Sequence, residues 1–136
     1  MLRFVAPFVF MAACASGGVE SPTAPAVNEE FTLAPGQTAV VTGTSLRVTF
    51  EAVRDDSRCP TDVTCIWEGD ATVVLKVKDG TDESSRELHT HQDGERSREA
   101  PAGEHTITLV KLDPAPNSTR PIEASAYRAT LKVSRR

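Results

Sequence analysis

Residues 55–69, DDSRCPTDVTCIWEG, contain two of the three cysteines of this 136-residue chain and its only tryptophan. Cys59 and Cys65 are separated by five residues, Pro60 among them, and the composition of this segment favours a turn. Because such a turn brings the two sulfurs together, we expect a disulfide in an oxidising compartment. We also expect Trp67 to pack on this bridge. Residues 55–69, called the stapled loop below, are predicted to be the most rigid irregular segment of the domain.

The segments on either side of the stapled loop alternate apolar and polar residues, as half-buried β-strands do. The first is Ser45–Arg54 and the second covers residues 71–78. We expect these two strands to pair with each other and to face the core with Leu46, Val48, Phe50, Val73, Leu75 and Val77. Ala52 falls on the same face of its strand as Phe50.

The remaining strands are predicted at 31–33, 38–42, 84–91, 105–112 and 126–133, with Gly, Pro, Asp or Asn between them. Residues 84–91 are polar and are expected at a sheet edge, whereas the charged segment 92–103 is expected to be a solvated, mobile loop. The alternation slips between Leu109 and Val110, as a β-bulge makes it do. No convincing helix is present. About seven strands predict an all-β fold, a single antiparallel β-sandwich of the immunoglobulin-like kind.

The N-terminus has the pattern of a secretory signal. Residues 1–3 supply a positive charge, and residues 4–11 form an apolar run too short to span a bilayer comfortably. Met11-Ala12-Ala13-Cys14 resembles the bacterial lipobox, which predicts a signal peptide at 1–13 and a lipidated Cys14. Lipid on Cys14 also removes the odd cysteine. The alternative is an ordinary signal cleaved between residues 13 and 18, with Cys14 incidental.

The domain organisation follows from this signal. Residues 14–28 are rich in Ala, Ser, Gly, Pro and Thr and are predicted to be a flexible tether, which leaves residues 29–136 for the β-sandwich domain. The expected location is the bacterial cell envelope. Ala15 follows the lipidated position where an aspartate would signal inner-membrane retention, so the outer membrane is favoured. The net charge is −4, with acids and bases interspersed, which gives no indication of nucleic-acid binding.

The same residues carry a resemblance to a known group of proteins. The order Asp56-Ser57-Arg58-Cys59-Pro60, Val63, Cys65, Trp67 and Gly69, with Tyr127, Leu131 and Val133 near the end, is similar to that of small, uncharacterised bacterial exported proteins and lipoproteins. Glu68 departs from the alanine expected at its position. The resemblance covers about residues 30 to 134, and it implies no activity.

The alternatives to a structural disulfide are a redox couple and a zinc site. Redox cysteines lie two residues apart at a helix N-terminus, and zinc needs two further ligands, neither of which the sequence shows. Trp67 has the alternative role of an exposed platform for stacking a ligand. Five acids lie near the staple and have the alternative role of holding calcium, although pairing with Arg54 and Arg58 is the ordinary interpretation; they are Asp55, Asp56, Asp62, Glu68 and Asp70.

Two histidines are candidates for a metal site. His89 and His91 point to the same face of the predicted strand 84–91, and Asp93 or His105 would complete a copper or zinc site. The interpretation that we favour places both imidazoles on a solvated face without a metal, and we expect no cofactor.

The chain lacks the sequence motifs of hydrolases, zinc proteases and phosphate-binding loops, so we expect no enzymatic activity. The first hypothesis is a membrane-anchored envelope lipoprotein that binds or supports another envelope protein, with Asp62, Thr64 and Trp67 as the candidate binding residues. The second is a periplasmic metal-binding protein that uses His89 and His91. The third is a protease-inhibitor-like module that presents the Cys59–Cys65 loop. The sequence does not indicate an oligomeric state.

Overall fold

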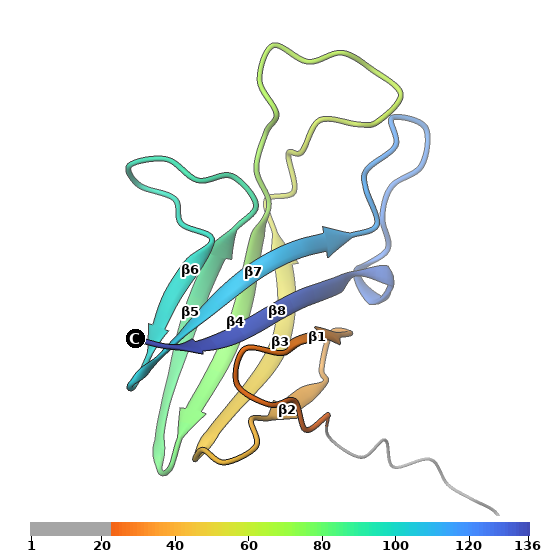
Figure 1. Cartoon of the computed structure of the whole chain (residues 1–136). Helices are drawn as coiled ribbons and strands as arrows, with labels where there is room; N and C mark the ends of the chain where they lie inside the picture. Colours follow the sequence, from red (N-terminus) through yellow and green to blue (C-terminus); the bar gives the residue numbers. More distant parts are fainter. Residues whose placement is uncertain (1–22) are drawn as a thin grey trace, which may run out of the picture.

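The computed structural model describes residues 23–136, and these residues form eight β-strands and one short 3₁₀ helix (Figure 1). The strands are β1 (Glu30–Leu33), β2 (Thr38–Val40), β3 (Leu46–Arg54), β4 (Thr72–Asp79), β5 (Asp82–His89), β6 (Glu99–Ala102), β7 (His105–Asp113) and β8 (Arg128–Arg135). The 3₁₀ helix, η1 (Ala124–Ala126), precedes β8. No helix among the described residues has the length and apolarity needed to cross a membrane.

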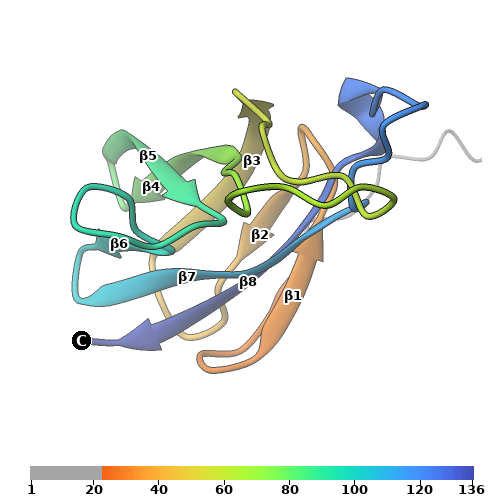
Figure 2. The same ribbon diagram turned by 90° about the horizontal axis from the view of Figure 1, so that it is seen from above.

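The strands form two antiparallel sheets that lie face to face (Figures 1 and 2). One sheet has the order β2-β3-β4-β5 and the other the order β1-β8-β7-β6. A single cluster of buried side chains draws on both sheets, with Phe50 and Leu75 from the first and Leu109 and Leu131 from the second. The prediction of an all-β, antiparallel sandwich is therefore confirmed.

The arrangement is immunoglobulin-like in its two packed layers, but each sheet is built mainly from consecutive strands. Strands β2 to β5 follow one another in one sheet, and β6 to β8 do so in the other, with β1 added beside β8. Immunoglobulin constant domains instead exchange strands between the sheets in Greek-key order. The chain passes from one sheet to the other after β1 and after β5, and the other connections stay within one sheet. The stapled loop is one of these, since it connects two hydrogen-bonded neighbours, β3 and β4.

The predicted pairing of the strands around the stapled loop is confirmed, with one correction. In the register of β3 and β4, Val48 faces Val77 and Phe50 faces Leu75. Ala52, predicted to lie on the same face as Phe50, is exposed because the register shifts between Phe50 and Ala52. Such a bulge inserts one residue and reverses the faces that follow it, so the alternation read from the sequence fails beyond Phe50.

A second register shift lies in β7, between Leu109 and Lys111, where the sequence predicts a bulge. This prediction is confirmed. Strand β5 is at the edge of its sheet, as expected, and its Leu88 is fully buried.

The segment 92–103 differs from the predicted mobile loop, because it contains the edge strand β6. Its preceding turn is fixed by Arg98, whose guanidinium donates hydrogen bonds to the carbonyl oxygens of Thr90, Leu109 and Val110. Asp93 accepts hydrogen bonds from the amides of Glu95 and Arg96. The charged residues of this segment therefore hold it together, which their composition alone does not reveal.

The predicted tether also needs a correction at its end, since residues 23–28 are hydrogen-bonded to the sandwich. The amide of Val40 donates to the carbonyl of Thr23 at 2.7 Å, and that of Thr42 donates to Pro25 at 2.8 Å. The amide of Asn28 donates to Val133 at 2.7 Å. Proline suits a segment that runs along a sheet edge, because it has no N–H group that would need a hydrogen-bond acceptor. The predicted signal peptide and Cys14 lie outside the described residues.

Candidate functional site

The stapled loop leaves one end of the sandwich between β3 and β4 (Figure 1). The predicted disulfide is present, with the Cys59 and Cys65 sulfurs 2.14 Å apart and their Cα atoms 5.9 Å apart. Closing so short a loop removes only about 2 kcal/mol of chain entropy from the unfolded state. The bridge therefore contributes more to the shape of the loop than to the stability of the fold.

The base of the stapled loop is fixed by a largely buried ion pair between Asp56 and Arg58. The guanidinium Nε and Nη2 of Arg58 each lie 2.8 Å from one carboxylate oxygen of Asp56. Arg58 also donates to the carbonyls of Leu112 and Pro114, at 2.8 and 3.0 Å. The hydroxyl of Tyr127 donates to Asp56 at 2.8 Å. One arginine thus ties the loop to the end of β7, and one tyrosine ties it to the start of β8.

This network changes the pKa values of its members. Burial opposes ionisation of Asp56, but the hydrogen bonds from Arg58 and Tyr127 outweigh it and hold the pKa of the carboxyl below its ordinary value of 3.8. Burial and the hydrogen bond to the Asp56 carboxylate raise the pKa of Tyr127 to about 12. Asp56 is therefore ionised and Tyr127 neutral near pH 7, which are the states that their hydrogen bonds need.

The two arms of the stapled loop meet at a narrow neck. The amide of Ser57 donates to the carbonyl of Asp70 at 2.7 Å, and the amide of Cys59 donates to Glu68 at 2.9 Å. Gly69 lies between these contacts with a φ of +73°, and a Cβ atom there would be 1.9 Å from the carbonyl oxygen of Ser57. Only glycine fits this position, for backbone conformation and for space.

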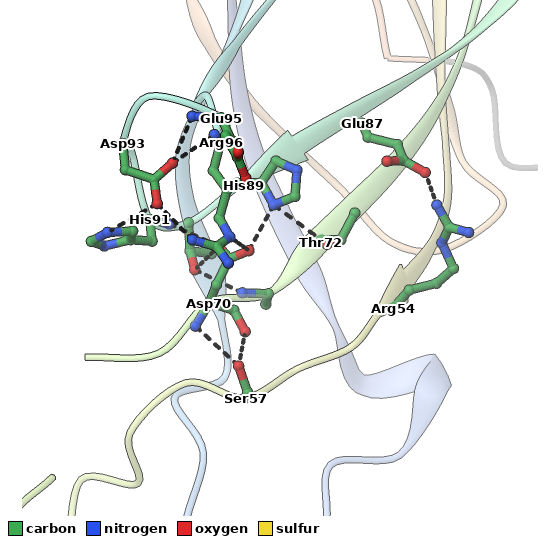
Figure 3. Close-up of polar contacts among 12 residues, drawn as sticks. Arg54, Ser57, Asp70, Thr72, Glu87, His89, His91, Asp93, Glu95 and Arg96 are labelled. Atoms are coloured by element: carbon green, nitrogen blue, oxygen red, sulfur yellow. Dashed lines mark hydrogen bonds and ion pairs between the residues drawn. The ribbon is translucent and has the colours of Figure 1, made fainter. Parts of the chain in front are cut away.

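The carboxylate of Asp70 joins the neck to the end of β5 (Figure 3). One of its oxygens lies 2.6 Å from Nδ1 of His89 and 3.7 Å from Nε of Arg96, and the other accepts from the amide of His91 at 3.0 Å. Burial alone would raise the pKa of Asp70. The His91 amide, the His89 ring and Arg96 together lower the pKa by more than burial raises it, so the net shift is downward. Asp70 is a structural carboxylate at this junction.

The histidines differ from the prediction of two freely exposed imidazoles. The His89 ring is bonded to Asp70, and Nδ1 of the His91 ring is bonded to Glu68, so each side chain is only about one-fifth to one-quarter exposed. Sequence reasoning missed these partners because Glu68, in the stapled loop, and Asp70, directly after it, are about 20 residues away from the histidines. Each histidine thus adds a tie between the loop and the neighbouring segment.

The structure also bears on the metal hypothesis. Within residues 23–136, no three His, Cys, Asp or Glu side chains are grouped as metal ligands would be. The suggested third ligand Asp93 is 3.9 Å from His91, at its Nε2, whereas His105 begins β7 at the opposite end of the sandwich. His89 uses Nδ1 to bind Asp70. The observed geometry gives no support to a copper or zinc site here.

Trp67 is not among the buried side chains of the core. Its side chain is half exposed, and its ring meets His91 edge-on with the ring centroids 5.4 Å apart. The guanidinium carbon of Arg96 lies 5.7 Å from the ring centroid, a cation–π contact. Trp67 precedes Asp70 by three residues, and the bonds from Asp70 to residues 89–91 bring this segment beside the indole.

Asp62 and Thr64, the other candidate binding residues, are both exposed, but Asp62 is not free. Its carboxylate accepts hydrogen bonds from the amide and the hydroxyl of Ser118, which lower the pKa of Asp62. The amide of Thr61 donates to Pro116 at 3.0 Å. Asp62 therefore holds the stapled loop against the 114–127 segment.

The most distinctive surface of the stapled loop is apolar. The large hydrophobic side chains that are exposed among the described residues are Val63, Ile66 and Trp67, and Ile66 is fully exposed. No binding role was predicted for Val63 or Ile66 from the sequence. The sequence does contain an indication of their exposure, because Val63 and Ile66 lie in a turn-forming loop and outside the predicted strands that build the core. We call these three residues the apolar tip.

Comparison of the chain with protein-family models, with curated proteins and with solved structures finds no match. The resemblance of the stapled-loop motif to small exported bacterial proteins therefore stays a prediction. The candidate site is defined by its own geometry.

Proposed function

We propose that this protein is a non-enzymatic, membrane-anchored lipoprotein of the bacterial cell envelope that uses the stapled loop to bind a partner. The observation that carries the proposal is the apolar tip, since all of the exposed large hydrophobic side chains of the described residues gather on one loop. Apolar side chains that are exposed to water in the free protein favour binding when a partner covers them. Full burial of an isoleucine contributes roughly 1.5 to 3 kcal/mol.

The contacts that restrain the stapled loop support the same proposal. The Cys59–Cys65 bridge closes the loop, Arg58 fixes its base, and Ser118 holds Asp62. A loop that is already ordered loses little conformational entropy on binding, so more of the contact energy appears as affinity. A connection that served only to link β3 to β4 has no need of this many restraints.

Replacing Ile66 by serine tests the role of the apolar tip. We expect the free energy of unfolding to change by less than about 0.5 kcal/mol, because the Ile66 side chain is fully exposed. Recovery of bound envelope proteins from detergent extracts should fall about tenfold, as the loss of a buried anchor of about 1.4 kcal/mol requires.

The control is Arg47→Ser, which removes an exposed side chain from β3, outside the stapled loop. It should leave recovery unchanged. Equal recovery with Ile66→Ser and the wild-type protein contradicts the proposed role of the loop.

The lipid anchor is tested separately with Cys14→Ser. We expect the variant to leave the membrane fraction and to appear in the soluble periplasmic or secreted fraction, because one cysteine carries the lipid. Immunoblots of fractionated cells, with outer and inner membranes separated by density, measure this. A Cys14→Ser protein that sediments with the outer membrane as before contradicts the anchor but leaves the binding role of the loop intact.

A protease-inhibitor-like module is the second candidate, and the same restrained loop with a fully exposed Ile66 favours it. An inhibitor of this kind inserts an exposed side chain into the specificity pocket of a protease and resists cleavage because its loop is held in place. Incubation with proteases of elastase and chymotrypsin specificity distinguishes it: stoichiometric inhibition that Ile66→Ser abolishes supports this role, and rapid cleavage within residues 61–67 contradicts it.

A further inference from the structure

We propose that the partner is a protein, and that Ile66 and Trp67 dock into an apolar pocket whose border carries lysine or arginine side chains. This inference rests on the proposed function and adds the chemistry of the binding surface. Three observations support it: the form of the apolar tip, the charges around it, and the direction in which it points.

The apolar tip has the form of an anchor for a pocket. Ile66 is fully exposed and touches no core, while Trp67 is held on one side by His91 and Arg96 and keeps half of its surface free. A fixed indole beside a projecting aliphatic side chain is the kind of feature that supplies most of the energy of a protein interface. Val63 is about half exposed and adds apolar area beside them.

The exposed charges of the stapled loop are all negative. Asp55, Asp62 and Glu68 are exposed, whereas the single basic residue of the loop, Arg58, is taken up by Asp56 and by two backbone carbonyls. The neighbouring segments carry charges of both signs: Asp93 and Glu95 are negative, and Arg96 and Arg120 are positive. The excess of acid therefore belongs to the loop that carries the apolar tip, and a pocket with a basic border is its electrostatic complement.

The direction of the apolar tip favours a protein over the bilayer that would hold the anchor. The carbonyls of Thr23 and Pro25 accept hydrogen bonds from Val40, in β2, and from Thr42. Val27 lies beside Gly43–Ser45, just before β3 begins. The stapled loop follows the other end of β3 (Figure 1). The tip thus points away from the end where the described chain begins. Its acids are also repelled by the anionic lipid of bacterial membranes.

The experiment places the photo-crosslinking residue p-benzoylphenylalanine at Ile66 of the full-length protein in living cells. The matched control carries it at Glu104, an exposed residue at the opposite end of the sandwich. We expect a protein adduct at Ile66 that is at least about tenfold above the control, a difference that corresponds to about 1.4 kcal/mol. Peptide mapping by mass spectrometry should place the crosslink at an apolar site of the partner. Lysine or arginine side chains should border this site in the structure of the partner.

A second arm measures charge with the Asp55→Asn/Glu68→Gln variant in isolated envelopes. The adduct yield of the parent should fall several-fold between about 0.05 and 1 M NaCl, where the screening length drops to roughly 3 Å, and the variant should be low and insensitive to salt. Asp62 is left unchanged because it is bonded to Ser118, and Glu68→Gln keeps a side-chain oxygen for the bond to His91 while removing the charge.

The outcomes separate this inference from the proposed function. An adduct with lipid, with a second copy of the chain or with a protein site that lacks basic residues overturns the inference, and so does a salt-insensitive parent, while the loop remains a binding element. No adduct at Ile66 above the Glu104 control overturns both.

Discussion

Gly69→Ala is expected to lower the free energy of unfolding by more than about 3 kcal/mol and to disorder the stapled loop. Gly69 has a φ of +73°, and an added Cβ would be 1.9 Å from the carbonyl oxygen of Ser57 and 2.8 Å from the Cα of Arg58. Both of these are backbone atoms, which no rotamer change can move aside. The two arms of the neck must therefore separate, and the Ser57–Asp70 and Cys59–Glu68 hydrogen bonds are lost. Urea denaturation measures the loss.

Gly80→Ala is the matched control for this substitution. Gly80 has a similar φ of +61° in the turn between β4 and β5, but nothing lies within 4 Å of the position of its Cβ. It should cost only about 1 kcal/mol, the penalty for placing an L-residue in the left-handed region. Equal costs at the two positions contradict the close approach at Gly69 as the cause. Hydrogen exchange in residues 55–69 should rise in the Gly69 variant alone.

The parts of the fold that the sequence predicts are those in which local alternation decides the answer. Val73, Leu75 and Val77 are buried as their period of two requires, and the interruption near Leu109 marks a true bulge. In these segments each residue either faces the core or faces water, so the pattern and the structure carry the same information.

The parts that were missed depend on partners far away in the chain. Glu51 and Ala52 continue the alternation of β3 in the sequence, but the pairing of β3 with β4 places a bulge there. Arg98 and the charged residues around it resemble a solvated loop until the carbonyls of Thr90 and Val110 are beside them. Hydrogen bonds between residues distant in sequence leave no periodic signal, so composition alone cannot reveal them.

The candidate site shows the same division. The disulfide was predictable, because its two cysteines are close in the sequence and have no other partner among the described residues. The roles of Asp56, Arg58 and Tyr127 were not, although they belong to the motif that opens the stapled loop and to the last strand segment. The structure explains Asp56, Arg58 and Tyr127 as internal supports of the loop, whereas Val63, Ile66 and Trp67 are exposed.

Arg58→Met is expected to lower the free energy of unfolding by about 3 to 5 kcal/mol at pH 7, because it leaves the Asp56 carboxylate in a largely buried site without its positive partner. The Asp56 and Arg58 side chains are only 14% and 13% exposed. Tyr127 donates one hydrogen bond to Asp56 but brings no charge. The control is Arg54→Met, which breaks an ion pair with Glu87 in which both side chains are about half exposed, and which should cost less than about 1 kcal/mol.

The pH dependence of this loss identifies the carboxylate as its source. In the wild-type protein the pKa of Asp56 is below its ordinary value of 3.8, so the unfolded chain takes up its proton at a higher pH than the folded protein does. The stability from the pair is therefore complete above about pH 5 and is lost as the pH falls through the folded pKa. In Arg58→Met burial remains while the guanidinium is gone, which raises the pKa of Asp56 relative to the wild type and reverses this trend. The difference between the two proteins, measured by urea denaturation from pH 7 to pH 3, should shrink as the pH falls. A difference that stays constant over this range shows that Arg58 acts through its contacts with Leu112 and Pro114 instead.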